Sequence, residues 1–181
     1  ATPVLAMVTL LALLPTSPVF LPGLFASDDK ASVLLFGIAM GLVVGSFEEL
    51  GWTGFAVPRL RLRHGVLRTG LAVGLVWGAW HFVLAFWASG NSSGTLSMQL
   101  FLPWVVYNVG VLPVYRVFMV WVYDRTRSLF VAILMHASLT GGLALILMPV
   151  AISGMPNIIW YLVLTAALWV LVGAVAVANG G

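Results

Sequence analysis

The chain has 181 residues, of which 62% are hydrophobic and only 7% are charged, and its mean hydropathy is +1.11. This composition excludes a soluble globule with a polar shell and indicates an integral membrane protein. The absence of cysteine excludes a disulfide framework, a thiolate nucleophile and a cysteine-ligated metal. The formal net charge of +3 comes from eight Lys and Arg residues that lie mostly in short loops, so it indicates membrane topology and not nucleic-acid binding.

Six apolar runs follow one another along the chain. They cover residues 3–20, 31–57, 69–88, 98–123, 129–148 and 158–178. The first run contains Pro15 and Pro18, and we expect it to form a kinked or half-length crossing because proline interrupts a helix. The other runs are long enough for membrane helices and lack the alternation of barrel strands. The sequence therefore predicts an all-α, polytopic bundle of about six membrane segments, forming a single transmembrane domain over residues 1–181.

Two loops carry most of the basic residues. They are Arg59, Arg61, Arg63 and Arg68 after the second run, and Arg125 and Arg127 after the fourth. With six crossings both loops lie on one side, which the positive-inside rule predicts to be cytoplasmic, together with both termini. Lys30 and the loop 89–95 are then expected on the opposite side. Arg116 lies inside an apolar run, so it must snorkel, pair with a partner or face a cavity.

Three separate runs carry an ionisable residue at a similar depth. At about 1.5 Å rise per residue, Glu48, His81 and His136 lie roughly 14 to 20 Å from the basic loops. Ionisable groups inside hydrocarbon are costly and usually mark a functional site. Glu49, which follows Glu48 directly, is either a second catalytic acid or the partner of a neighbour such as Arg116.

Stripes of small residues mark the contact faces of these runs. They are Gly37, Gly41 and Gly45 in the second run, and Gly70, Gly74 and Gly78 in the third. At about 100° per residue, Glu48 and His81 fall on these faces and Glu49 falls well off its face, so we expect Glu48 to meet His81. In the fifth run Ser128, Ala132, His136 and Thr140 also recur at four-residue spacing. We therefore expect His136 and Thr140 to look into the same interior.

Other notable residues have packing explanations or secondary roles. The tryptophans Trp77, Trp80, Trp87 and Trp104 are expected to serve as packing or interface aromatics. Tyr107, Asn108 and Tyr115 are candidates to line the cavity.

The chain carries three motifs in a characteristic order. They are Glu48-Glu49-Leu50-Gly51-Trp52-Thr53-Gly54-Phe55, Trp77-Gly78-Ala79-Trp80-His81, and Ser128-Leu129 leading to His136-Ala137-Ser138-Leu139-Thr140. This pattern resembles the CPBP family of CAAX prenyl endopeptidases and bacteriocin-processing or self-immunity proteins, also called the ABI family. The resemblance covers residues 31–148. It departs from the family pattern at two positions, because Thr53 stands where the family has arginine and Thr140 where it usually has asparagine.

The resemblance implies an intramembrane endopeptidase without a cofactor. Its substrate would be a peptide or a membrane protein, prenylated or not, met within membrane lipid. Glu48, helped by His81, would act as general base on water, and His136 would stabilise the oxyanion with Thr140. A threonine hydroxyl is shorter than an asparagine amide, so we expect a shifted or weaker oxyanion hole. Thr53 would leave Glu49, the supporting carboxylate, without the family's cation.

Three alternatives stay open at this point. Glu48, His81 and His136 could ligate zinc with water in the fourth position, although a metal would leave the second glutamate and the asparagine position harder to explain. The chain could instead be a catalytically inactive immunity factor, a scaffold or a small subunit of a larger membrane complex, which the departures at Thr53 and Thr140 favour. A proton or solute relay ranks last, since no inverted repeat is visible.

Overall fold

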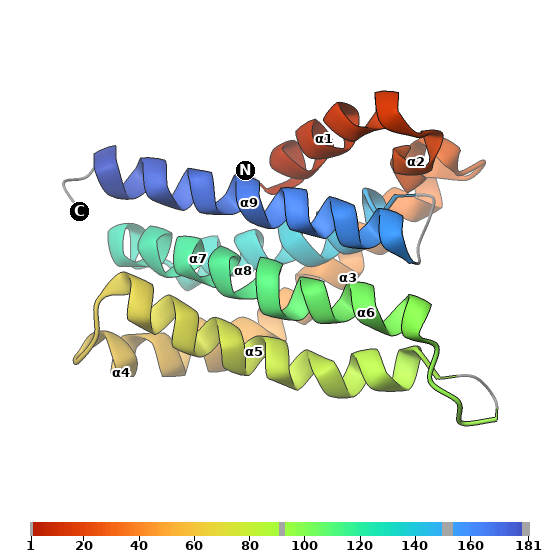
Figure 1. The fold of residues 1–181 in the computed structure, drawn as a ribbon. Coiled ribbons are helices and arrows are strands. Elements are labelled where there is room, and N and C mark those ends of the chain that lie inside the picture. The colour runs from red at the N-terminus through yellow and green to blue at the C-terminus, as the bar shows by residue number, and fades with distance from the viewer. Residues whose placement is uncertain (1, 91–92, 150–153, 179–181) are drawn as a thin grey trace.

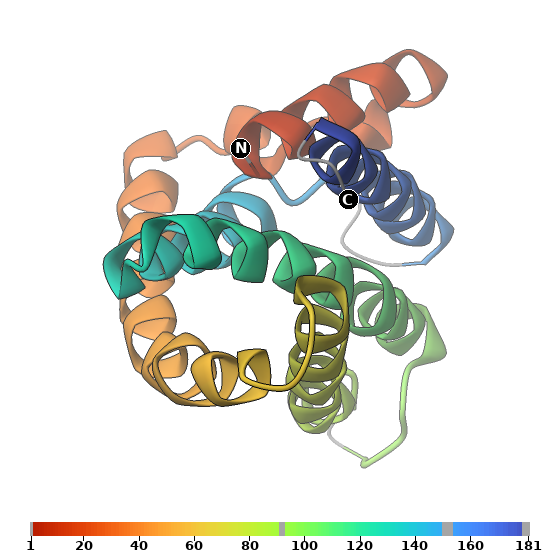
Figure 2. The ribbon, with the colours of Figure 1, turned by 90° about the vertical axis from the view of Figure 1, so that its left-hand side faces the viewer.

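The computed structural model describes residues 2–90, 93–149 and 154–178, and over these ranges the chain is helical without a strand. Within them, five helices are long and apolar enough to cross a membrane. They are Lys30–Arg61, Val66–Ala88, Met98–Thr126, Leu129–Ile146 and Met155–Ala178. These helices pack against one another in one bundle (Figure 1), which the Met98–Thr126 path crosses at an angle (Figure 2). The prediction of an all-α, polytopic membrane bundle is therefore confirmed.

The first apolar run forms a short helix, as its prolines predict. Helix α1 (Thr2–Leu13) is followed by two 3-10 turns, which begin around Pro15 and Pro18, and by α2 (Gly23–Ala26). At about 1.5 Å per residue α1 is roughly 18 Å long, well short of a hydrocarbon core of about 30 Å. It packs against α9 (Met155–Ala178) and against the end of the fifth run. The half-length segment thus covers part of the bundle and leaves five full spans.

The second run is one long helical path with a change of pitch near its end. Asp29 caps the N-terminus of helix α3 (Lys30–Gly51), because its Oδ1 accepts a hydrogen bond from the Ser32 N–H at 3.0 Å. Hydrogen bonds from Ser32 lower the pKa of this exposed carboxyl below its ordinary value. The path then passes through the π-helical turn η3 (Trp52–Ala56) into α4 (Val57–Arg61).

The remaining runs follow the predicted order, with further π-helical segments. They comprise α5 (Val66–Ala88), α6 (Met98–Val106), η4 (Tyr107–Val111), α7 (Leu112–Thr126), α8 (Leu129–Ala137) and η5 (Ser138–Ile146). Helix α7 ends at Arg127, whose φ of 52° is left-handed and turns the chain into α8. The π-helical segments were not predicted. Such segments are frequent at functional sites, and here all three lie next to site residues.

The glycine stripes lie at the closest helix contacts, as predicted. A Cβ added to Gly78 on α5 would stand 2.2 Å from the carbonyl oxygen of Asn108, which lies on η4. A Cβ added to Gly41 on α3 would stand 2.6 Å from the carbonyl oxygen of Ala137 on α8. The stripe on α5 therefore packs against η4 and α7, and the stripe on α3 packs against α8 and η5.

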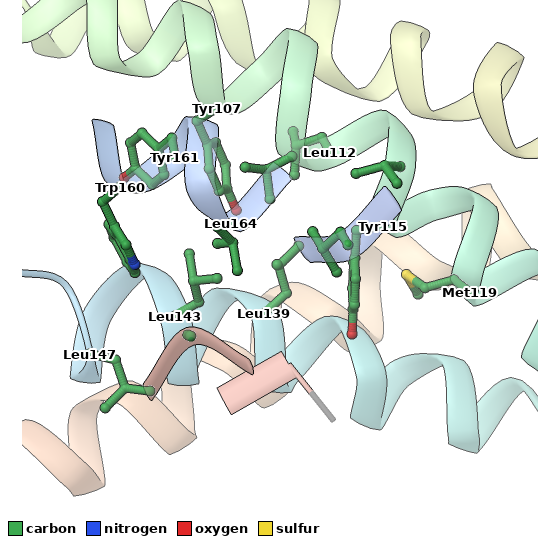
Figure 3. Close-up of a cluster of buried hydrophobic side chains, with 14 of the residues drawn as sticks. Tyr107, Leu112, Tyr115, Met119, Leu139, Leu143, Leu147, Trp160, Tyr161 and Leu164 are labelled. Atoms are coloured by element: carbon green, nitrogen blue, oxygen red, sulfur yellow. The ribbon is translucent and has the colours of Figure 1, made fainter. Parts of the chain in front are cut away.

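The two faces of α7 separate an apolar core from the site. In Figure 2, α7 lies between α1 and α9 on one side and α4 and α5 on the other. Aromatic and aliphatic side chains of η4, α7, η5 and α9 fill the first side (Figure 3). Among them are Tyr107, Leu112, Tyr115, Leu139, Leu143, Trp160, Tyr161 and Leu164. The opposite face of α7 carries the charged residue Arg116 toward α3 and α5.

The two ends of the bundle differ in charge as predicted. Helix α4 and the junction of α7 and α8 lie at one end together with the C-terminal end of α9, whereas α2 and the loop after α5 lie at the other (Figure 1). At the basic end, Arg61 Nε donates to Asp124 Oδ2 at 2.9 Å and ties α4 to α7. The assignment of this end to the cytoplasm stays a prediction.

Candidate active site

A buried ion pair joins α3 to α7 at the centre of the site. Arg116 donates from Nη1 to Glu49 Oε2 and from Nη2 to Glu49 Oε1, each at 2.9 Å. Both side chains are fully buried. The Thr53 hydroxyl donates to Glu49 Oε2, and the Arg116 guanidinium carbon lies 4.2 Å from the ring centroid of Trp77. A bidentate, charge-assisted pair of this kind fixes both partners and keeps the Glu49 carboxylate ionised.

His136 is oriented by the same carboxylate. Its Nδ1 lies 2.7 Å from Glu49 Oε1. An ionised carboxylate only accepts hydrogen bonds, so Nδ1 must carry the proton and donate it. The His136 Nε2 is buried, has no hydrogen-bond partner within the described ranges, and lies 4.0 Å from Glu48 Oε2. The network therefore aims this nitrogen at Glu48.

Two tryptophans hold the Glu48 carboxylate by one oxygen. The indole N–H groups of Trp77 and Trp52 donate to Glu48 Oε2 at 2.7 Å and 3.2 Å. The other oxygen, Oε1, lies 4.0 Å from His81 Nε2. The side chains of Glu48 and His81 are each 22% exposed, whereas Glu49 is sealed inside the protein. Of the two carboxylates, only Glu48 can be reached from outside.

A backbone carbonyl of α5 determines which ring nitrogen of His81 carries the proton in the neutral imidazole. Its Nδ1 lies 2.9 Å from the Trp77 carbonyl oxygen, one helical turn earlier. Because a carbonyl oxygen only accepts, His81 Nδ1 carries the proton, and the neutral ring has its lone pair on Nε2. That lone pair faces Glu48 Oε1. Trp77 packs edge-on against the imidazole of His81, at 5.8 Å between centroids.

The structure brings Glu48, Glu49, His81 and His136 together from α3, α5 and α8. Thr140 is half-buried on η5, and no hydrogen bond joins it to these residues in the part of the chain that the structure describes. The role of Thr140 stays a prediction.

The prediction that Glu49 falls well off the contact face of α3 is wrong. Glu49 is buried with Gly37, Gly41 and Gly45 and continues their four-residue spacing. The error comes from the period, since each four-residue step turns by about 40° at 3.6 residues per turn, so the stripe itself drifts. Glu48 lies beside this stripe, at the edge that faces Trp77 and His81.

Of the two roles that the sequence leaves open for Glu49, the structure shows the pairing with Arg116. Arg116 supplies the charge from α7, 67 positions away in the sequence. The sequence named Arg116 as one candidate partner but offered no way to place it. Asn108 also lies buried on η4, and both atoms of its amide have no hydrogen-bond partner among the described residues.

The site residues are not arranged as a metal centre. In the ranges the structure describes, no group of three or more His, Asp and Glu side chains is placed to hold a metal ion. Glu48 Oε2 already accepts two indole N–H groups. Glu48, His81 and His136 as they stand do not form a zinc ligand set. The mechanism proposed below therefore uses only protein side chains and water.

The fold defines a polytopic helical bundle with a cluster of glutamate and histidine side chains inside it, and sequence comparison gives the family. The sequence model of the "Type II CAAX prenyl endopeptidase Rce1-like" family matches residues 30–142, more than half of the chain. The chain therefore belongs to this family, within the CPBP group that its motifs resemble.

A curated relative supports the same membership. "CAAX prenyl protease 2" of Methanococcus maripaludis is 28% identical over 120 residues, which cover 65% of this chain and 41% of the relative. The chain thus spans about two fifths of the length of that relative. No solved structure gives a significant match.

Proposed function

We propose that the chain is an intramembrane endopeptidase of CAAX-protease type in which Glu48 activates a water molecule. The observation that carries this proposal is the unequal state of the two carboxylates. Glu49 has both oxygens engaged by Arg116 and His136 inside the protein. Glu48 keeps Oε1 free and reachable, opposite the lone pair of His81. Only Glu48 is therefore suited to accept a proton from water.

The gap between Glu48 and His81 fits one water molecule. At 4.0 Å, Glu48 Oε1 and His81 Nε2 are too far apart for a direct hydrogen bond, but a water at about 2.8 Å from each can bridge them. Glu48 Oε1 takes a proton as the water oxygen bonds to the substrate carbonyl carbon, which becomes a tetrahedral oxyanion. Collapse of the oxyanion breaks the C–N bond, and Glu48 returns its proton to the leaving amine.

The charges of the cluster favour that intermediate. The charges of Glu49 and Arg116 cancel. In the proposed scheme His136 is an imidazolium and Glu48 a carboxylate before the reaction, and these two charges also balance. When Glu48 takes the proton from water, the protein groups carry one net positive charge, opposite to the charge of the oxyanion. Glu49 stabilises the His136 imidazolium, whose Nε2–H then donates toward the oxyanion. Glu49 is in this scheme a positioning residue.

The substrate class follows from the family and the setting. We expect a peptide or a membrane protein, prenylated or not, that presents its scissile bond within membrane lipid. A further membrane protein as complex partner is compatible with this scheme.

The test is cleavage of membrane peptides, including one with a prenylated CAAX end, by the purified full chain in lipid. Glu48→Gln and His81→Ala should each reduce cleavage at least 100-fold, because they remove the base and its partner. The matched controls Asp28→Asn and His64→Ala change exposed loop residues and should cleave as wild type does. Equal cleavage by Glu48→Gln and wild type would overturn the site assignment.

Two further arms separate the alternatives. A chelator should leave cleavage unchanged, and stoichiometric zinc whose removal abolishes cleavage would replace the metal-free mechanism. If the wild-type chain cleaves none of these peptides, the non-catalytic alternative of an immunity factor, scaffold or small subunit is favoured. The lack of a hydrogen bond between Thr140 and the glutamate–histidine cluster, within the described residues, also favours that alternative.

A further inference from the structure

Asn108 is a buried polar residue whose side chain makes no hydrogen bond to the described residues. It is 1% exposed, and neither its amide nitrogen nor its amide oxygen has a partner among the described residues. An unpaired amide inside a membrane bundle costs stability, which calls for an explanation in function or in a missing partner.

The direction of Asn108 follows from its neighbours on the same helix. Tyr107 and Tyr115 are eight positions apart and both point into the apolar cluster (Figure 3). Eight residues of an α-helix would turn them apart by about 80°. The π-helical turn η4 (Tyr107–Val111) removes this offset. Asn108 follows Tyr107 directly, and Arg116 follows Tyr115 directly. Because the two tyrosines share a face, Asn108 and Arg116 also share one.

That face looks into the site. Arg116 reaches Glu49 and the ring of Trp77 from it. Along the helix axis, a Cβ on Gly74 would stand 3.1 Å from Arg116 Cβ, whereas a Cβ on Gly78 would stand 2.2 Å from the Asn108 carbonyl oxygen. Asn108 thus lies about two helical turns from Arg116 along the path of η4 and α7, and its backbone is level with Gly78, which lies between Trp77 and His81 on α5.

We propose that the Asn108 side-chain amide donates a hydrogen bond to the oxyanion of the tetrahedral intermediate, alongside His136 Nε2. This inference rests on the proposed function.

Two other polar groups near the site are less suited to that role. Arg116 commits Nη1 and Nη2 to Glu49 and keeps only its buried Nε without a partner among the described residues. Thr140 makes no hydrogen bond to the cluster in the described ranges. The His136 Nε2 is buried and unpaired in the same region, and oxyanion sites commonly combine two donors. Asn108 would supply from η4 the amide that position 140 lacks.

The test measures kcat and KM of the purified full chain on a peptide that wild type cleaves. Asn108→Leu and Asn108→Ala should each lower kcat about 100- to 1000-fold with little change in KM, because the donor acts on the oxyanion. Asn108→Leu should unfold at a temperature no lower than wild type, because it removes an unpaired buried amide. The control is Asn157→Leu in α9, another buried asparagine with an unpaired oxygen, which should keep kcat.

A second-site variant separates a donor role from a packing role. Adding Thr140→Asn to Asn108→Leu returns an amide to the position where the family carries asparagine, and it should recover at least tenfold of the lost kcat. Asn108 variants within threefold of the wild-type kcat, or a loss that Thr140→Asn does not recover, would overturn the inference and leave the proposed function intact. Absence of cleavage by wild type is the separate outcome that overturns the proposed function, and the inference with it.

Discussion

At the scale of single residues, Arg116 compensates for a departure from the family motif. Threonine at position 53 leaves Glu49 without a cation on its own helix, and Arg116 provides two hydrogen bonds from α7. Thr53 then adds a hydroxyl donor to the same carboxylate. The departure therefore relocates the charge and does not remove it.

Removal of Arg116 should destabilise the protein strongly. Arg116→Leu leaves the Glu49 carboxylate buried and uncompensated, and the loss of one partner of a buried pair costs about 3–5 kcal/mol. Adding Thr53→Arg should recover part of this loss, because it places a cation one turn after Glu49. Denaturant unfolding in detergent measures both effects. Arg59→Leu, at an exposed position over Phe55, should change stability by about 0.5 kcal/mol or less.

The sequence identified the ionisable side chains but not all of their contacts. Depth alone brought Glu48, His81 and His136 to one level, because charges inside apolar runs stand out. The buried pair of Glu49 with Arg116 joins two helices, and a helical wheel contains no distance between helices. The sequence therefore named Glu49 and Arg116 as possible partners but could not decide between this pairing and the other role of Glu49.

At the scale of helices, the length of each apolar run predicted the membrane spans. The local changes of helical pitch could not be predicted from the sequence. The predicted run 69–88 corresponds to α5 and the run 31–57 to α3 with its extension, since membrane thickness sets the length of each. The π-helical segments have no such signature, because the change of pitch brings no change of composition. The segment η4 nevertheless decides which of its side chains share a face with those of α7.

The contact of α5 with η4 and α7 should tolerate no added atom. Gly78→Ala places a methyl against the Asn108 backbone, and it should destabilise by about 1–3 kcal/mol and lower cleavage. Gly173→Ala on α9 has open space around its Cβ and should be neutral or stabilise by up to about 1 kcal/mol. Thermal unfolding of the two variants compares them directly. An equally mild effect at both positions would contradict the tight approach.

At the scale of the whole molecule, the basic loops predict how the bundle sits in the membrane. The Arg-rich ends of α4 and α7 lie at one end, and the loop after α5 lies at the other (Figure 1). The structure places these groups at opposite ends of the bundle. The positive-inside rule then predicts that the Arg-rich end is cytoplasmic.

The absence of cysteine allows this orientation to be measured without further engineering. His64→Cys and Thr95→Cys introduce single thiols in exposed loops at opposite ends of the bundle. In sealed cells a membrane-impermeant maleimide should label Thr95→Cys and leave His64→Cys unlabelled until the cells are opened. The reverse pattern would invert the topology.

The ion pair between α3 and α7 has a consequence for how such chains are classified. A search that demands arginine four residues after the second glutamate would sort this chain among inactive relatives, although an arginine on another helix holds the carboxylate by two hydrogen bonds. Co-substitution of positions 53 and 116 is the pattern to look for among sequences that break the motif. A genome survey that scores the pair, and not the motif alone, would separate relocated charges from lost ones.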